Sequence, residues 1–163
     1  MNEHAPAILV ALEGSAFAAG IRSSTWAYMT ANVGHIVFLF CFACSIAVMD
    51  LRMAGALAAT TPGFVISTAR KFAMAAFGGM AVTGFILFSA EASHVAINPV
   101  FQIKVAMIAL GLANVAWFQF AVLPRVRNLP PLKPLPTTAR VSGVASIAIW
   151  LCVAVLGRSI AYF

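Results

Sequence analysis

The chain has 163 residues, of which 63% are apolar and 9% are charged, and its mean hydropathy is +0.99. A soluble domain is nearer half apolar and a quarter charged. This composition therefore excludes a soluble globular enzyme, a disordered chain and a small disulfide-held domain, and it leaves an integral membrane protein of one domain. The formal net charge of +6 is interpreted as loop charge that sets membrane topology, and no nucleic-acid partner is expected.

The first segment, about 5–21, predicts an amphipathic helix that lies in the membrane interface. Ile8 and Leu12 recur at helical spacing, and Glu13 lies off their face. The apolar stretch imitates a signal peptide, but Glu3 precedes it and no Lys or Arg does, which is the wrong start for such a peptide. A disordered leader is the alternative.

Charged residues divide the rest of the chain into four long apolar runs. No Asp, Glu, Lys or Arg occurs within 23–49, 72–90, 105–124 or 141–157. Each run is about the 17–25 residues that a helix needs to cross a bilayer, and lipid offers the backbone no other hydrogen-bond partner. We predict transmembrane helices at about 25–49, 71–93, 100–123 and 140–161. The fold class is therefore all-α: an integral membrane four-helix bundle formed by the single domain 1–163, preceded by the interfacial helix.

The basic residues indicate the topology. The connections after the first and third helices hold Arg52, Arg70, Lys71, Arg125, Arg127, Lys133 and Arg140, whereas the connection up to Pro99 holds no Lys or Arg. The positive-inside rule places the two basic connections in the cytoplasm and both termini outside. We expect a mildly apolar loop over 53–69 and an extended, proline-rich loop over 124–136.

Polar side chains inside the spans are functional-site candidates, because burying them in lipid is costly. His35 lies about 14 Å from Trp26 along the first span, at 1.5 Å per residue. Tyr28, Asn32 and His35 have the i, i+4, i+7 spacing of one helix face. Asn32 is placed to hydrogen-bond the imidazole and fix its tautomer. The alternative is a neutral histidine bonded to a neighbouring helix.

Lys104 lies about 8 Å inside the third span, counted from Pro99. It either extends its ammonium to the interface or pairs with an anion, for which Glu91 at the end of the second span is the obvious acid. His94 shares a helix face with Glu91 and is either a second metal ligand or a solvated loop residue. With Arg158, these groups belong to the outer half of the bundle.

Two runs of the sequence resemble an uncharacterised family of small bacterial four-helix membrane proteins. They are Leu12-Glu13-x-Ser15…Ile21-Arg22-x-Ser24-x-Trp26-x-Tyr28…His35-Ile36…Asp50-Leu51-Arg52 and Asn98-Pro99-x-Phe101-x-Ile103-Lys104…Asn114. The resemblance implies a bacterial inner (cytoplasmic) membrane, so that both termini are expected in the periplasm. It names no activity. Asn32 stands where that family is expected to have an acid.

A more distant similarity concerns the HemJ-type protoporphyrinogen oxidases and the CopD-like membrane proteins. They share a histidine in the first span, an arginine after it and a lysine early in the third. The similarity implies a haem b whose axial ligand is His35 and whose charged, catalytic partner is Lys104. Lys104 and Arg158 would face the haem propionates. The expected cofactor-binding set is His35, Asn32, Tyr28, Lys104, Arg158 and Glu91, and the expected metal ligands are His35 and His94.

These observations favour a membrane haem protein for electron transfer or oxidoreduction at the periplasmic side, with a quinone or other membrane subunits as partners. Two alternatives stay open. The small extramembrane mass of the chain also suits a non-catalytic accessory subunit of a larger complex, and the spans could instead carry a small solute or a metal. Oligomeric state is open as well.

Overall fold

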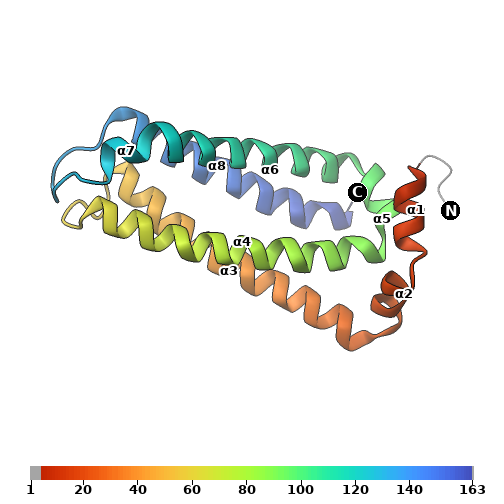
Figure 1. Cartoon of the computed structure of the whole chain (residues 1–163). Helices are drawn as coiled ribbons and strands as arrows, with labels where there is room; N and C mark the ends of the chain where they lie inside the picture. The colour runs from red at the N-terminus through yellow and green to blue at the C-terminus, as the bar shows by residue number, and fades with distance from the viewer. Residues whose placement is uncertain (1–4, 163) are drawn as a thin grey trace.

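Four long helices dominate the computed structural model, which describes residues 5–162. They are α3 (Thr25–Ala54), α4 (Pro62–Ala90), α6 (Pro99–Trp117) with its continuation through η1 (Phe118–Val122) and α7 (Leu123–Val126), and α8 (Thr137–Ser159) with the short 3-10 turn η2 (Ile160–Tyr162) (Figure 1). No strand occurs in this part of the chain. Each long helix is long and apolar enough to cross a membrane, so the expected all-α four-helix bundle is confirmed and a multi-pass membrane protein is supported.

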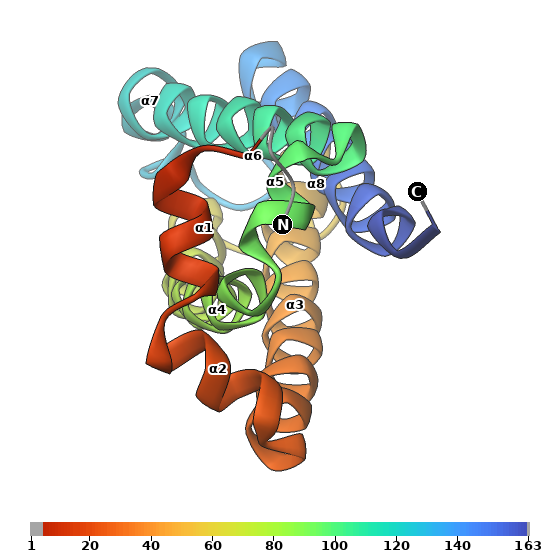
Figure 2. The same cartoon turned by 90° about the vertical axis from the view of Figure 1, so that its right-hand side faces the viewer.

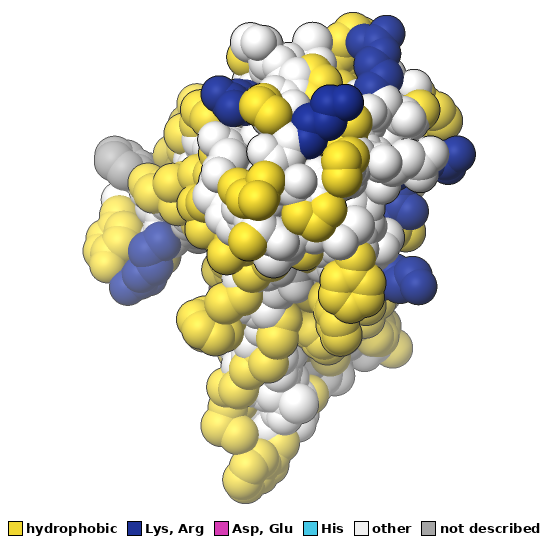
Figure 3. All heavy atoms as spheres, turned by 90° about the vertical axis from the view of Figure 1, so that its left-hand side faces the viewer, with side chains coloured by type: hydrophobic (Ala, Val, Ile, Leu, Met, Phe, Trp, Pro, Cys, Tyr) yellow, Lys and Arg dark blue, Asp and Glu magenta, His cyan; other side chains and the backbone are white. Residues whose placement is uncertain are grey.

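The bundle has two unlike ends, seen at the left and right of Figure 1. We call the end with the connections 55–61 and 127–136 the loop end. The other end carries both termini and the short helices α1 (Ala7–Glu13), α2 (Ala16–Ser23) and α5 (Ala92–Ile97), and we call it the terminal end. Basic side chains are prominent on the face at the loop end (Figure 3).

The long helices pack as two pairs, α3 with α4 and α6 with α8, and the pairs meet where α3 crosses α8. In contrast, α4 and α6 scarcely touch. Viewed from the terminal end, α3 and α8 run in different directions (Figure 2). The bundle is therefore closed at the loop end and spread apart at the terminal end.

The first connection is shorter than the expected loop over 53–69. Helix α3 continues to Ala54, where Gly55 closes it with a left-handed φ of 107°, and α4 begins at Pro62 rather than near 71. Both residues suit these positions: glycine adopts positive φ without steric cost, and proline at the first helical position gives up no hydrogen bond. Only 55–61 is irregular here.

The third span also runs past its expected end near 123, through a π-helical turn at Phe118–Val122, and ends at Val126. Pro124 explains the π turn, because it has no N–H to donate and its ring clashes with the carbonyl of Phe120 in a regular α-helix. The proline-rich segment 124–136 is thus helical at its start and irregular only from Arg127.

The N-terminal segment forms two helices rather than the single helix expected over 5–21. Ser15 separates them, and its hydroxyl accepts a hydrogen bond of 3.2 Å from the amide of Ala18 at the start of α2. Both helices lie across the terminal end of the bundle (Figure 2). Arg22 fastens α2 to the end of α4 by donating from Nη1 to the carbonyl of Ala90 at 2.9 Å.

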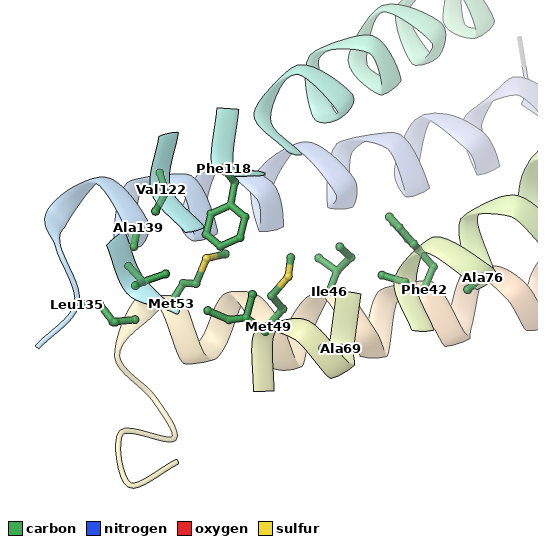
Figure 4. Close-up of a cluster of buried hydrophobic side chains, with 13 residues drawn as sticks. Phe42, Ile46, Met49, Met53, Ala69, Ala76, Phe118, Val122, Leu135 and Ala139 are labelled. Carbon is green, nitrogen blue, oxygen red and sulfur yellow. The ribbon is translucent and has the colours of Figure 1, made fainter. Parts of the chain in front are cut away.

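The hydrophobic core lies toward the loop end (Figure 4). Its buried side chains come from the loop-end halves of α3 and α4, from η1 and α7, from the end of the connection 127–136 and from the start of α8. They are Phe42, Ile46, Met49, Met53, Ile66, Ala69, Ala73, Ala76, Phe118, Val122, Val126, Leu135 and Ala139. Gly143 lets α8 approach α3 closely, since a Cβ there would be 3.1 Å from both the Asp50 carbonyl oxygen and the Met53 Cβ.

Candidate functional site

The imidazole of His35 is bonded to α4, as one of the two sequence interpretations expects. Its Nδ1 lies 3.0 Å from the hydroxyl of Thr83, and that hydroxyl donates its own proton to the carbonyl of Gly79 at 2.7 Å. Because that proton is used by Gly79, the geometry favours the tautomer in which Nδ1 of His35 donates to the Thr83 oxygen and Nε2 carries the lone pair. Asn32 was expected to make this bond and does not. The ring points toward α4, whereas Asn32 is exposed on the surface of α3.

Close helix packing holds the His35 ring in place. A Cβ at Gly84 would lie 3.2 Å from Cε1 and 3.6 Å from Nδ1, so the absence of a side chain there makes room for that edge of the ring. His35 is half-buried. Nδ1 and Cε1 therefore face α4, and Nε2 is the ring nitrogen left without a partner.

Lys104 is half-buried on α6 and lies against α8, where a Cβ at Gly157 would be 3.3 Å from Nζ. The expected pairing with Glu91 is not formed: Glu91 is exposed at the junction of α4 and α5. Within residues 5–162 the Lys104 ammonium has no carboxylate partner.

The remaining predicted site residues do not join this pair. Tyr28 is 41% exposed on α3, and Arg158 is exposed and donates to the Tyr162 hydroxyl at 2.8 Å. The helix breaks at Glu91, so His94 lies on α5, exposed, and not on the helix face that the sequence suggested. Within residues 5–162 no three His, Cys, Asp or Glu side chains group as a metal site.

The acid that forms hydrogen bonds between distant segments at the terminal end is Glu13, which the sequence interpretation had left out of the site. Its carboxylate accepts from the amide of Ser93 at 2.7 Å and from the Ser93 hydroxyl. These two bonds, the hydroxyl first, lower the pKa of Glu13. Glu13 thus caps the first turn of α5 from a distant part of the chain, and no local sequence pattern could have shown it.

A second group of polar residues surrounds a cavity of about 250 Å³ among α3, α4, α6 and α8 toward the loop end. Asp50 and Arg52 lie two residues apart near the loop end of α3 and do not pair with each other. Arg52 donates to the carbonyl of Thr60 at 3.0 Å. Asp50 lines the cavity with 0% of its surface exposed, and within residues 5–162 neither of its carboxylate oxygens has a hydrogen-bond partner.

The cavity is otherwise mainly aromatic and aliphatic. Phe42, Phe77 and Trp150, from three different helices, are in contact across it, with ring centroids 4.7 Å apart for Phe42 and Trp150 and 6.0 Å apart for Phe77 and Trp150. Arg70 of α4 also lines it and donates to the side-chain oxygen of Gln119 in the π turn. The loop end therefore offers a largely apolar chamber with a few buried polar groups.

Comparison with known proteins places the chain in a family. Residues 12–163 match the model of the family of unknown function DUF6644. The chain belongs to DUF6644. No curated protein and no solved structure matches it, and these comparisons show no similarity to the HemJ-type or CopD-like proteins. The expected membership of an uncharacterised family is confirmed. Because DUF6644 brings no assigned activity, the site residues must be judged from geometry.

Proposed function

We propose that this DUF6644 protein is a multi-pass protein of the bacterial inner membrane that holds a b-type haem on His35, for electron transfer or oxidoreduction at the periplasmic side. The state of the His35 ring is the observation that carries the proposal. Donation from Nδ1 to Thr83 leaves Nε2 with a free lone pair. A histidine that ligates a metal through one nitrogen commonly donates from the other in this way.

In a haem site, His35 would supply one protein ligand and Lys104 a cation for a propionate. Within residues 5–162 Lys104 has no carboxylate partner. His94 is exposed on α5, outside the helix that carries His35. When bound, haem supplies one-electron chemistry. The chain's own part is to orient the imidazole through Thr83 and to balance the anionic edge of the cofactor with Lys104.

An absorption spectrum of the detergent-purified protein tests the cofactor. Protein made in haem-supplemented cells should show reduced-minus-oxidised Soret and α bands. His35→Ala should abolish them while the protein still inserts, because its hydropathy hardly changes. His94→Ala is the matched control and should keep the full spectrum. A protein without these bands, or a His35→Ala variant that keeps them, would show that the haem assignment is wrong.

The role of Lys104 can be tested separately from ligation. Lys104→Met keeps most of the length and the apolar stem and removes only the charge. If the ammonium balances a propionate, haem occupancy should fall clearly, and Lys104→Arg should restore part of it. If Lys104 only extends to the interface, occupancy should not change, and the residue would be removed from the site.

The topology belongs to the same proposal. Five Lys and Arg residues lie in or within four residues of the two connections at the loop end, and Arg70 and Lys71 lie in the loop-end half of α4. The positive-inside rule places this end in the cytoplasm. Both termini are then periplasmic, and so is the side on which His35 lies. A C-terminal reporter that is active only in the cytoplasm should stay silent. Activity of that reporter would move the site to the inner leaflet.

The partners are also part of the proposal. Electron transfer at His35 requires a redox partner, for which another membrane subunit, a second copy of the chain and a lipid-soluble quinone are the candidates. Crosslinking in membranes followed by electrophoresis distinguishes a protein partner, either another subunit or a second copy of the chain, from a quinone. Only a protein partner adds a large mass to the crosslinked product.

A further inference from the structure

The cavity at the loop end holds buried polar atoms that no protein group satisfies. Asp50 is 0% exposed and Ser146 is 2% exposed, and both line the cavity. Within residues 5–162, neither carboxylate oxygen of Asp50 has a hydrogen-bond partner, nor does the Ser146 hydroxyl, the Trp150 indole nitrogen or the Arg70 Nε. Four residues on three helices that line the cavity thus carry polar atoms with unused hydrogen-bonding capacity.

Such an arrangement is costly when the chamber is empty. A buried polar group without a hydrogen-bond partner costs about 1–3 kcal/mol, and most buried polar groups are therefore paired. The chamber of about 250 Å³ has the volume of about eight liquid water molecules. Its walls are formed chiefly by Phe42, Ile46, Phe77 and Trp150, which offer that much water too few partners. An amphiphilic ligand would pack against the apolar side chains and give the polar groups hydrogen-bond partners.

The entrance to the cavity lies between α4 and α6 and faces the bilayer. Helices α4 and α6 scarcely touch, and α8 is visible between them in Figure 1. Met74 and Gly78 on α4 and Leu112 on α6 line the cavity and are exposed on the outer surface of the bundle. On the loop-end side, the Arg70–Gln119 hydrogen bond joins the two helices. A ligand that enters between them must be soluble in lipid.

The walls also restrict the head group of that ligand. Phe42, Phe77 and Trp150 favour a flat ring, because aromatic side chains stack on or meet ring edges. Trp150 and Arg70 offer N–H donors, whereas Asp50 offers acceptors. Asp50 and Arg70 carry opposite charges, so a neutral head group is favoured over a carboxylate or an ammonium.

We propose that this cavity binds the head group of a lipid-soluble quinone or quinol, with the apolar tail leaving between α4 and α6. The carbonyl oxygens of the ring accept from Trp150 and Arg70, and a quinol hydroxyl donates to Asp50. A single substituted six-membered ring is the size of head group that the chamber suits. This site is formed entirely by loop-end residues and does not depend on a haem at His35.

Fluorescence of Trp150 tests the proposal directly. The other two tryptophans, Trp26 and Trp117, are 76% and 58% exposed and can be replaced by Phe. In a His35→Ala background, which removes any haem at that position, decylubiquinone should quench Trp150 along a saturable curve. Hexadecane, which has a tail and no head group, should not displace it.

Two variants of α4 form a matched pair for the same titration. Gly78→Leu narrows the entrance without a clash, since nothing lies within 4 Å of a Cβ at that position, and should weaken binding at least tenfold. Ala75→Leu enlarges an exposed residue of the same helix that does not line the cavity and should leave binding unchanged. Asp50→Asn and Ser146→Ala should each weaken it several-fold.

The opposite results would overturn the proposal. Quenching that rises linearly without saturation means that the quinone only partitions into the micelle. Displacement by hexadecane means that the chamber takes an acyl chain and not a head group. Equal effects of Gly78→Leu and Ala75→Leu mean that the quinone does not enter between α4 and α6. These results leave the haem spectrum untouched, so the two proposals can fail separately.

Discussion

The two ends of the bundle differ in how closely the same helices pack. At the loop end α3 lies against α4 and α8, its side chains are buried, and Asp50 is enclosed without a partner. At the terminal end α3 lies beside α4 and the short helix α2 and diverges from α8 (Figure 2). His35 there is half-buried and hydrogen-bonded. The comparison shows that the histidine makes one hydrogen bond from its ring, whereas the carboxylate in the packed half makes none within residues 5–162.

The first prediction compares the stability contributed by the loop-end core with that contributed by the open terminal end, using one methionine of α3 from each. Met53 is 1% exposed in the loop-end core, whereas Met29 is 44% exposed near the terminal end. Met53→Ala should lower the free energy of unfolding by about 2–5 kcal/mol because it leaves a cavity. Met29→Ala should change it by no more than about 0.5 kcal/mol. Denaturation in detergent measures both, and equal effects would remove the distinction between the ends.

The second prediction concerns the enclosed acid. Asp50→Asn replaces a buried carboxyl group whose oxygens lack partners with an uncharged side chain of the same shape, so the ligand-free protein should keep its stability or gain up to about 1–3 kcal/mol. The same change should weaken quinone binding. Thermal unfolding with and without decylubiquinone measures the two effects together. A loss of stability in the ligand-free variant would mean that the Asp50 carboxylate is satisfied in the protein, and the cavity would lose its strongest polar feature.

The third prediction tests the His35 bond. Thr83→Val should remove an interhelical hydrogen bond worth about 1 kcal/mol and leave the ring free to rotate. If His35 ligates haem, the α band should broaden or shift while Thr30→Val, an exposed change on α3, leaves it unaltered. A spectrum unchanged by Thr83→Val would separate the Thr83 bond from cofactor binding.

The fourth and smallest effect concerns the N-terminal segment. The pKa of Glu13 is lowered by its bonds to Ser93, so its carboxylate stabilises the docked segment above the ordinary glutamate pKa of about 4.3. That contribution is lost as the pH falls through the lowered value. The protection of the 7–23 amides from hydrogen exchange, corrected for the intrinsic rate at each pH, should therefore fall in acid, and Glu13→Gln should remove much of this pH dependence. A loss of protection in acid that is the same in Glu13→Gln would show that another group holds the segment.

The sequence alone determined the number of long helices and most of their course. Charge-free runs of the right length predict spans because a bilayer tolerates few charges and demands a helix of fixed length. The ends were less predictable. The π turn before Pro124 and the early start of α4 at Pro62 depend on where a proline can be accommodated. Hydropathy does not report this.

Only the tertiary structure decided which polar groups meet. Helical spacing places Asn32 and His35 on one face, but it says nothing of the helix opposite, which supplies Thr83. The partner of Glu13 is 80 residues away. That Asp50 has no hydrogen-bond partner becomes apparent only once α4, α6 and α8 are placed around it. The periodic pattern of a sequence shows which side chains share one face of a helix. Contact between helices depends on their crossing and spacing, which the packing of the whole bundle sets.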